Sequence, residues 1–169
     1  MKKLLFSLLL LVFILPSICN AQTTINTSAL KIDVGPSLAL PIRQLNYVSL
    51  FGVGAYGSIT TPVIENLDVG GRVSASYFFG KSQYGVSNAG SRIFDVMATG
   101  SYLLPQNVFV GIDLGVGFAA EPGFNNTELA DSFNVGYQMD YQKHVLRFAV
   151  FFDQTTYQKC AGVRATVRL

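Results

Sequence analysis

The sequence predicts an all-β protein, an eight-stranded antiparallel up-and-down transmembrane β-barrel. Three observations predict this fold. Apolar and polar residues alternate along most of the chain, the alternating segments are long enough to cross a bilayer, and their charges fall on one face. Of the 169 residues, 50% are hydrophobic and 13% are charged, yet only the N-terminus holds a long unbroken apolar run. Such a composition suits strands that alternate between lipid and lumen.

The N-terminus has the features of a secretory signal peptide. Met1-Lys2-Lys3 is positively charged, residues 4–18 are largely apolar, and Cys19-Asn20-Ala21 places small residues before a cleavage point. The apolar run of about 15 residues is shorter than the roughly 20 that a membrane-spanning helix needs. A retained anchor and a lipid-modified Cys19 are the alternatives. We therefore expect a cleaved signal peptide over residues 1–21 and an exported barrel domain over residues 22–169.

Charge and cysteine content limit the partners and the stabilising bonds. Without Lys2 and Lys3, ten of the 12 basic residues remain and balance the ten acidic residues, so no nucleic-acid partner is expected. Cys160 is the one cysteine left after cleavage, and it cannot form an internal disulfide. Its position at the start of the last strand, on the polar face, indicates a small inward-facing filler residue.

Eight segments alternate over at least nine residues each, close to the length at which a tilted strand crosses a bilayer. In order, the predicted strands span residues 30–40, 47–60, 67–79, 93–104, 108–120, 132–141, 145–153 and 160–169. The first begins Leu-Lys-Ile-Asp-Val, and the fifth sets Val, Ile and Leu against Asp113 and three glycines. The last sets Ala and Val against Arg164 and Arg168. Scattered glycine and the lack of a 3.6-residue apolar stripe argue against long helices.

The charges within the strands share one face. Four strands carry two charges each, and matching parity in all four would arise by chance about one time in sixteen. We expect the charged face to line the lumen as a paired, structural network, because an isolated buried charge costs several kcal/mol. The predicted network is Lys31, Asp33, Asp68, Arg72, Asp95, Asp113, Asp140, Arg147, Asp153, Arg164 and Arg168.

Side-chain volume decides which face points outward. The interior of an eight-stranded barrel is only just wide enough for side chains to fill. The apolar face carries many aromatic rings, whereas the polar face offers glycines beside its long charged side chains, so the polar face fits the lumen. The aromatic residues expected at the membrane interfaces are Tyr77, Phe79, Tyr102, Phe118, Phe133 and Tyr141. A soluble, lipocalin-like periplasmic barrel that binds an apolar ligand inside is the alternative.

The links between strands also fall into two classes. The links at residues 61–66, 105–107 and 142–144 are short, whereas those at 81–92 and 121–131 are long and rich in Gly, Asn and Ser. Short links are expected at the periplasmic end and long loops outside. Because binding residues on rigid scaffolds concentrate in loops, the candidate outer contacts are Tyr84, Arg92 and Phe124.

Together, the signal peptide, the alternating strands, the glycine and aromatic content and the eight-strand length resemble the outer membrane protein beta-barrel domain family, the OmpX-, OmpA- and PorT-like small barrels. The resemblance covers nearly all of residues 22–169. It implies a bacterial outer-membrane location, outer-membrane lipid as a partner, and a surface ligand at the loops. Such barrels usually end on Phe or Trp, whereas this sequence ends Val167-Arg168-Leu169.

Signals for enzyme chemistry are sparse. The one histidine, His144, falls in a predicted short periplasmic turn, and no predicted lipid-facing position carries the carboxylate that a Ser/His/acid site on the outer lipid face would need. One histidine and one mature cysteine cannot build a typical zinc site. Neither Gly-Val-Gly segment has the lysine and following helix of a phosphate loop. We expect a non-enzymatic protein without a cofactor, with a structural or loop-mediated binding role. A narrow pore through the lumen is the alternative.

Overall fold

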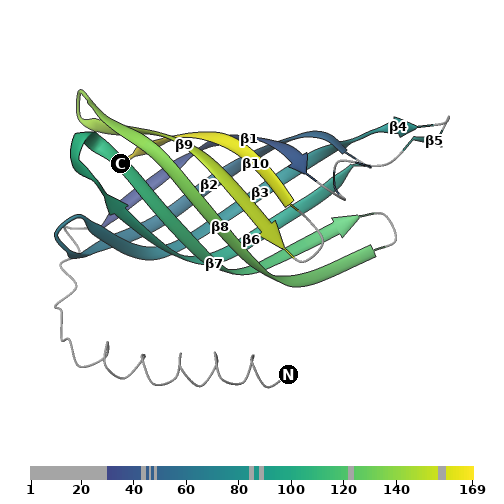
Figure 1. Cartoon of the computed structure of the whole chain (residues 1–169), viewed down its shortest axis with the longest axis horizontal. Coiled ribbons are helices and arrows are strands. Elements are labelled where there is room, and N and C mark those ends of the chain that lie inside the picture. The colour runs from purple at the N-terminus through teal and green to yellow at the C-terminus, as the bar shows by residue number, and fades with distance from the viewer. Residues whose placement is uncertain are drawn as a thin grey trace, which may run out of the picture.

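The computed structural model describes residues 30–42, 45, 47, 49–83, 86–87, 90–121, 124–155 and 159–169. The predicted signal peptide and Tyr84 lie outside these residues. Eight strands close into one barrel in the order β1-β10-β9-β8-β7-β6-β3-β2, and every neighbouring pair is antiparallel (Figure 1). The strands are β1 (Lys31–Ile42), β2 (Ser49–Ile64), β3 (Leu67–Gly80), β6 (Ser91–Leu103), β7 (Val108–Glu121), β8 (Phe124–Tyr141), β9 (His144–Thr155) and β10 (Lys159–Arg168).

The two ends of the barrel differ. At the end that we call the turn end, tight connections join β2 to β3, β6 to β7 and β8 to β9, and the β6–β7 connection contains the short 3-10 helix η2 (Pro105–Asn107). Asn66, Gln106, Asn107 and Gln142 adopt a positive φ there, as tight turns require. The C-terminus and the start of β1 lie at this same end, where the Leu169 N–H donates to the Ile32 carbonyl (Figure 1).

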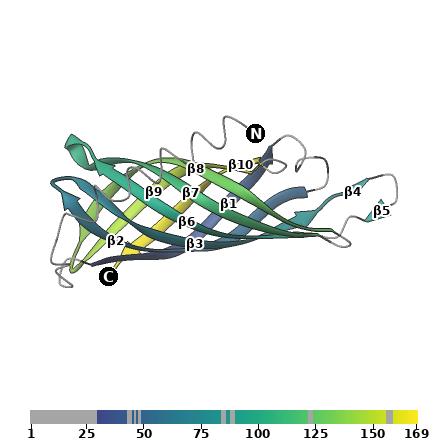
Figure 2. The same ribbon diagram turned by 90° about the horizontal axis from the view of Figure 1, so that it is seen from below.

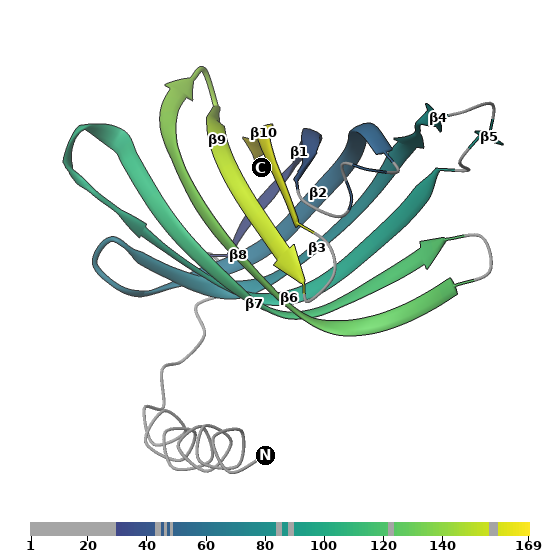
Figure 3. The same cartoon turned by 45° about the vertical axis from the view of Figure 1, so that its right-hand side comes forward.

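The opposite end, which we call the hairpin end, carries longer extensions. A small two-stranded sheet, β4 (Ser82–Gln83) and β5 (Val86–Ser87), projects between β3 and β6, and the β7–β8 hairpin reaches beyond β9 and β10 (Figure 3). Seen from the side, the strands run obliquely to the long axis, as closure of a barrel demands (Figure 2). No helix in the described part of the chain is long and apolar enough to span a membrane.

The two faces of the barrel are sorted as the alternation predicts. The buried residues of the strands include charged and hydroxyl side chains such as Asp33, Arg72 and Asp113, whereas large apolar side chains such as Leu40 and Val150 are exposed on the outside. The six aromatic residues that we expect at the membrane interfaces are all exposed. A soluble barrel with an apolar interior would show the opposite arrangement, so the lipocalin-like alternative does not fit the structure.

The long link predicted over residues 121–131 differs from the structure. Residues 124–131 form part of β8, because β7 and β8 pair continuously from Val108↔Tyr137 to Glu121↔Phe124. The prediction of a loop over residues 121–131 was therefore wrong. Its Pro-Gly pair and its two asparagines are typical of turns, but cross-strand pairing with β7 overrides that preference from Phe124 onward. Phe124 opens β8, and Arg92 lies near the start of β6 opposite Tyr77 and Ala120.

Three phenylalanines share the lumen with the polar residues, and each lies directly opposite a glycine on the neighbouring strand. The pairs are Phe78 with Gly52, Phe109 with Gly136, and Phe151 with Gly162. A Cβ on Gly136 would lie 2.5 Å from the Phe109 ring and 2.2 Å from the Phe148 carbonyl oxygen. The rings are 0%, 3% and 5% exposed, so in these pairs the glycine supplies the space that the ring fills.

Candidate functional site

At the turn end of the lumen, ion pairs join four strands, β1, β3, β9 and β10. Arg147 Nη1 lies 2.9 Å from Asp33 Oδ2, and Arg168 Nε lies 3.0 Å from Asp33 Oδ1. Lys31 Nζ lies 2.6 Å from Asp68 Oδ1, and Arg168 Nη2 lies 3.8 Å from the other oxygen of that carboxylate. We call these five residues the turn-end network. Three cations share two carboxylates in it.

A second set of ion pairs crosses the middle of the lumen. Arg72 Nη1 lies 2.7 Å from Asp113 Oδ2, with both side chains 0% exposed, and Arg72 Nη2 lies 3.5 Å from Asp153 Oδ1. The Thr99 hydroxyl and the Asn134 amide also donate to the Asp113 carboxylate. We call Arg72, Asp113 and Asp153 the central network. Each of its pairs joins strands that are not neighbours in the barrel.

Two predicted network members interact without an ion pair. Asp95 is buried and accepts a hydrogen bond from the Ser74 hydroxyl. Arg164 forms no ion pair with any described carboxylate. Its guanidinium carbon lies 4.0 Å from the centre of the Tyr56 ring and 5.6 Å from that of Phe151, within the range of cation–π contacts.

The predicted position of Asp140 is wrong. It was expected in the lumen, and the structure places it at the exposed end of β8, opposite Val145 and next to the turn that leads to His144. Its parity is that of the lumen, but the barrel ends here, so water reaches the carboxylate. Ten of the eleven predicted charges are therefore buried or half-buried inside the barrel.

Aromatic rings of the lumen, absent from the predicted network, support two of its arginines. Phe109 supports the Arg147 guanidinium, whose carbon lies 3.8 Å from the ring centre, and Tyr56 supports that of Arg164. The signal was present in the sequence, because Phe109 alternates in step with Asp113 along β7 and Phe151 alternates in step with Arg147 along β9.

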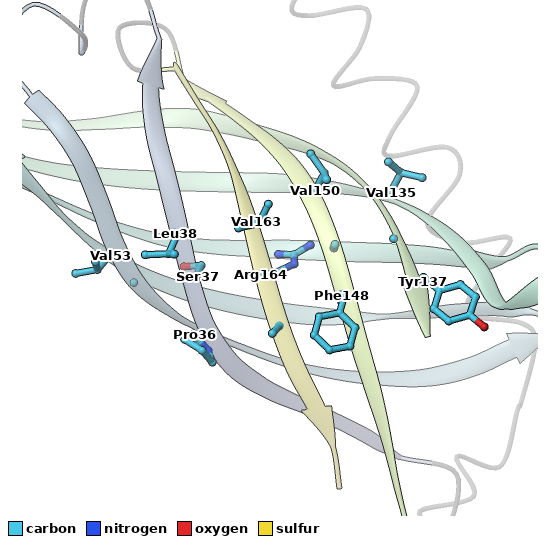
Figure 4. Close-up of a pocket in the computed structure, with 14 residues that line it drawn as sticks. Pro36, Ser37, Leu38, Val53, Val135, Tyr137, Phe148, Val150, Val163 and Arg164 are labelled. Atoms are coloured by element: carbon cyan, nitrogen blue, oxygen red, sulfur yellow. The ribbon is translucent and has the colours of Figure 1, made fainter. Parts of the chain in front are cut away.

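The outer surface bears a hollow of about 820 Å³ across five adjacent strands, β2, β1, β10, β9 and β8 (Figure 4). Its outward-facing lining includes Leu38, Val53, Phe148, Val150 and Val163. These side chains offer hydrocarbon contact but no group for catalysis.

Groups that could support metal or hydrolytic chemistry are not gathered in the barrel. Among the described residues, no group of three His, Cys, Asp or Glu side chains is placed to hold a metal ion. His144 is exposed at the start of β9. Cys160 is a free, buried thiol that faces the lumen near the hairpin end.

The architecture matches solved structures of bacterial surface proteins. Neisserial surface protein A (NspA) aligns with a TM-score of 0.62 and 13% identity over 83% of this chain and 96% of that protein. Ail, the attachment invasion locus protein of Yersinia pestis, aligns with a TM-score of 0.59 and 11% identity over 82% of this chain and 95% of Ail. The fold is that of the small eight-stranded outer-membrane barrels.

At these identities the likeness concerns the fold alone. A second structure of Ail, in complex with the heparin analogue sucrose octasulfate, aligns with a TM-score of 0.57 and 11% identity over 82% of this chain and 96% of that one. No protein-family model matches the sequence, and no curated protein matches it.

Proposed function

We propose that the chain is an exported, non-enzymatic protein of a bacterial outer membrane that binds a surface partner at its hairpin end. Two features support the membrane location. The outer face carries large exposed side chains such as Leu40, Ile112 and Leu114, at 64%, 59% and 61% exposure, which lipid would cover. The predicted signal peptide would route the chain through the inner membrane.

The lumen is proposed to be closed to ions. The central network bridges β3 to β7 and to β9, so charged side chains cross the middle of the barrel. Two inner cavities, one lined in part by Asp95 and Asp153 and the other in part by Thr99 and Asn134, measure about 30 and 20 Å³, space for one or two water molecules each. A pore is the second candidate function, favoured by the ten charges that line the lumen. Planar-bilayer recordings of the purified barrel should show no conductance steps, and regular steps would favour the pore.

The observation that carries the binding role is an unpaired strand edge. β9 pairs with β8 only as far as Ala130↔Thr155, whereas β8 continues to Phe124. Residues 124–127 therefore have a pairing partner in β7 on one side and, among the described residues, no strand on the other (Figure 3). About four residues at roughly 3.4 Å each give a free edge about 14 Å long. Such an edge is a template for an extended peptide segment.

Charge indicates which peptide would fit. Residues 118–131 contain Glu121, Glu128 and Asp131 and neither lysine nor arginine. The acidic hairpin around this edge favours a partner with basic side chains, because opposite charges attract across an interface. It does not favour a polyanion of the kind bound in the Ail complex. We therefore propose a basic, extended segment of a partner protein as the ligand.

Shortening the hairpin tests this binding role while β6 and β7 stay paired from Phe94↔Phe118 to the turn end. Phe118 and Thr127 face each other in register, so Asn-Gly in place of residues 119–126 closes a two-residue turn between them. Phage-displayed random dodecapeptides would be selected on the wild-type barrel in phospholipid nanodiscs. Enriched peptides should be basic and bind the shortened variant at least tenfold more weakly. Equal binding to both proteins, or no enrichment over empty nanodiscs, would contradict the proposal.

A further inference from the structure

A small cavity lies inside the barrel between the turn-end network and the central network. It measures about 20 Å³, and its walls contain no carboxylate. Its polar lining consists of two guanidinium groups and hydroxyl or amide groups that can donate hydrogen bonds. Those residues are Arg147, Arg164, Tyr56, Ser58, Thr60, Thr99, Ser101, Thr166 and Asn134.

Polar groups at this cavity lack partners. Arg147 is 9% exposed and donates to Asp33 and Ser101 through its two Nη atoms, but its buried Nε has no hydrogen-bond partner. The buried Thr60 hydroxyl is also unpartnered. Arg164 is 8% exposed, its guanidinium contacts the Tyr56 and Phe151 rings, and it forms no ion pair among the described residues. A buried cation without a counter-charge is costly, so this site calls for an anion.

Charge is unevenly distributed along the lumen. The turn-end network and Arg164 together hold four cations (Lys31, Arg147, Arg164 and Arg168) and two carboxylates (Asp33 and Asp68), an excess of two positive charges. The central network and Asp95 hold one cation (Arg72) and three carboxylates (Asp95, Asp113 and Asp153), an excess of two negative charges. The cavity lies on the positively charged side of the lumen, beside the Arg164 guanidinium, which has no ion pair among the described residues.

We propose that this cavity binds one small monovalent anion of the chloride class between Arg147 and Arg164. Size selects the class, since the cavity has room for about one water-sized sphere, too little for sulfate or phosphate. Charge selects an anion over water, because water would leave the Arg164 charge uncompensated. The Thr60 hydroxyl is placed to donate the hydrogen bond that it lacks within the protein.

The turn end provides a route of entry. A vestibule of about 410 Å³ opens there, lined in part by Lys31, Asp68 and Arg168. Ser101, Phe109 and Arg147 line both the vestibule and the inner cavity. The Arg147 guanidinium stacked on Phe109 therefore forms the partition between them, and a small displacement of that side chain would admit an ion.

Crystals of the full barrel grown in bromide test the proposal directly. Anomalous scattering at the bromine absorption edge should show one peak between Arg147 and Arg164, at millimolar as well as molar bromide. The peak should be absent in Arg164→Gln and retained in Arg92→Gln, whose arginine is exposed on β6. A cavity with no bromine signal, a peak only at molar bromide, or a peak that survives Arg164→Gln would overturn it.

A solution measurement covers the case in which Arg164→Gln does not fold. The urea midpoint of the wild-type barrel should rise with the logarithm of chloride concentration when gluconate replaces chloride at constant ionic strength, as mass action requires for a ligand of the folded state. Arg92→Gln should keep that dependence. Equal midpoints in chloride and gluconate would refute a bound chloride, whatever the behaviour of the variant.

Discussion

Arg72 is the one cation that faces three carboxylates at the centre of the lumen, and its removal should destabilise the barrel more than removal of its closest partner. Arg72→Met leaves Asp113 and Asp153 without their cation. Breaking a buried pair in this way costs about 3–5 kcal/mol. Asp113→Asn keeps the shape and leaves Arg72 its contact with Asp153 at 3.5 Å. Its cost should be that of one charge-assisted hydrogen bond, about 1.5–3 kcal/mol.

Urea unfolding of the barrel in lipid vesicles measures the difference, with folded and unfolded fractions separated by their mobility in cold SDS gels. With a denaturant dependence of about 2 kcal/mol per molar urea, a loss of about 4 kcal/mol lowers the midpoint by about 2 M. Arg92→Met, at an exposed arginine on β6, should change the stability by less than about 0.5 kcal/mol. Equal midpoints for Arg72→Met and Asp113→Asn, or a wild-type midpoint for Arg72→Met, would refute the reasoning.

Three further predictions concern the wall of the barrel. Val150→Lys, in the middle of β9, should lower the stability in vesicles by about 2–4 kcal/mol because it places a charge in lipid. Leu129→Lys, on the projecting part of β8, should change the stability little. Equal losses of stability would mean that the membrane does not surround the middle of the barrel. Gly136→Ala should cost about 1–3 kcal/mol through its clash with Phe109, while Gly71→Ala, whose Cβ would meet nothing closer than 3.9 Å, serves as the control in the same urea titration. Unboiled and boiled samples should migrate differently in SDS gels, and identical mobility would argue against a closed barrel.

Alternation along the chain predicted the number of strands and the face that each residue takes, because a period of two follows from backbone geometry alone. The extent of β8 could not be predicted this way. Asn125, Asn126 and Thr127 have low or moderate strand preference, and pairing with β7 decides their conformation.

The pairing inside the lumen was also beyond the sequence. Arg147 on β9 meets Asp33 on β1, although β10 lies between those strands and the two residues are 114 positions apart in the chain. Which side chains meet across a barrel depends on strand tilt and stagger, which the alternation does not encode. Parity alone also places Asp140 in the lumen, because parity does not reveal where the barrel ends.

The three pairs of facing phenylalanine and glycine have a consequence for how this chain can change in evolution. In each pair the phenylalanine ring fills the space left by the glycine, so a larger residue cannot replace the glycine while the phenylalanine remains. Substitutions at Gly52, Gly136 and Gly162 should therefore occur in homologues together with a smaller residue opposite, or with the phenylalanine moved to the other strand. Such exchanges would preserve the wall of the barrel while identity to other barrels falls.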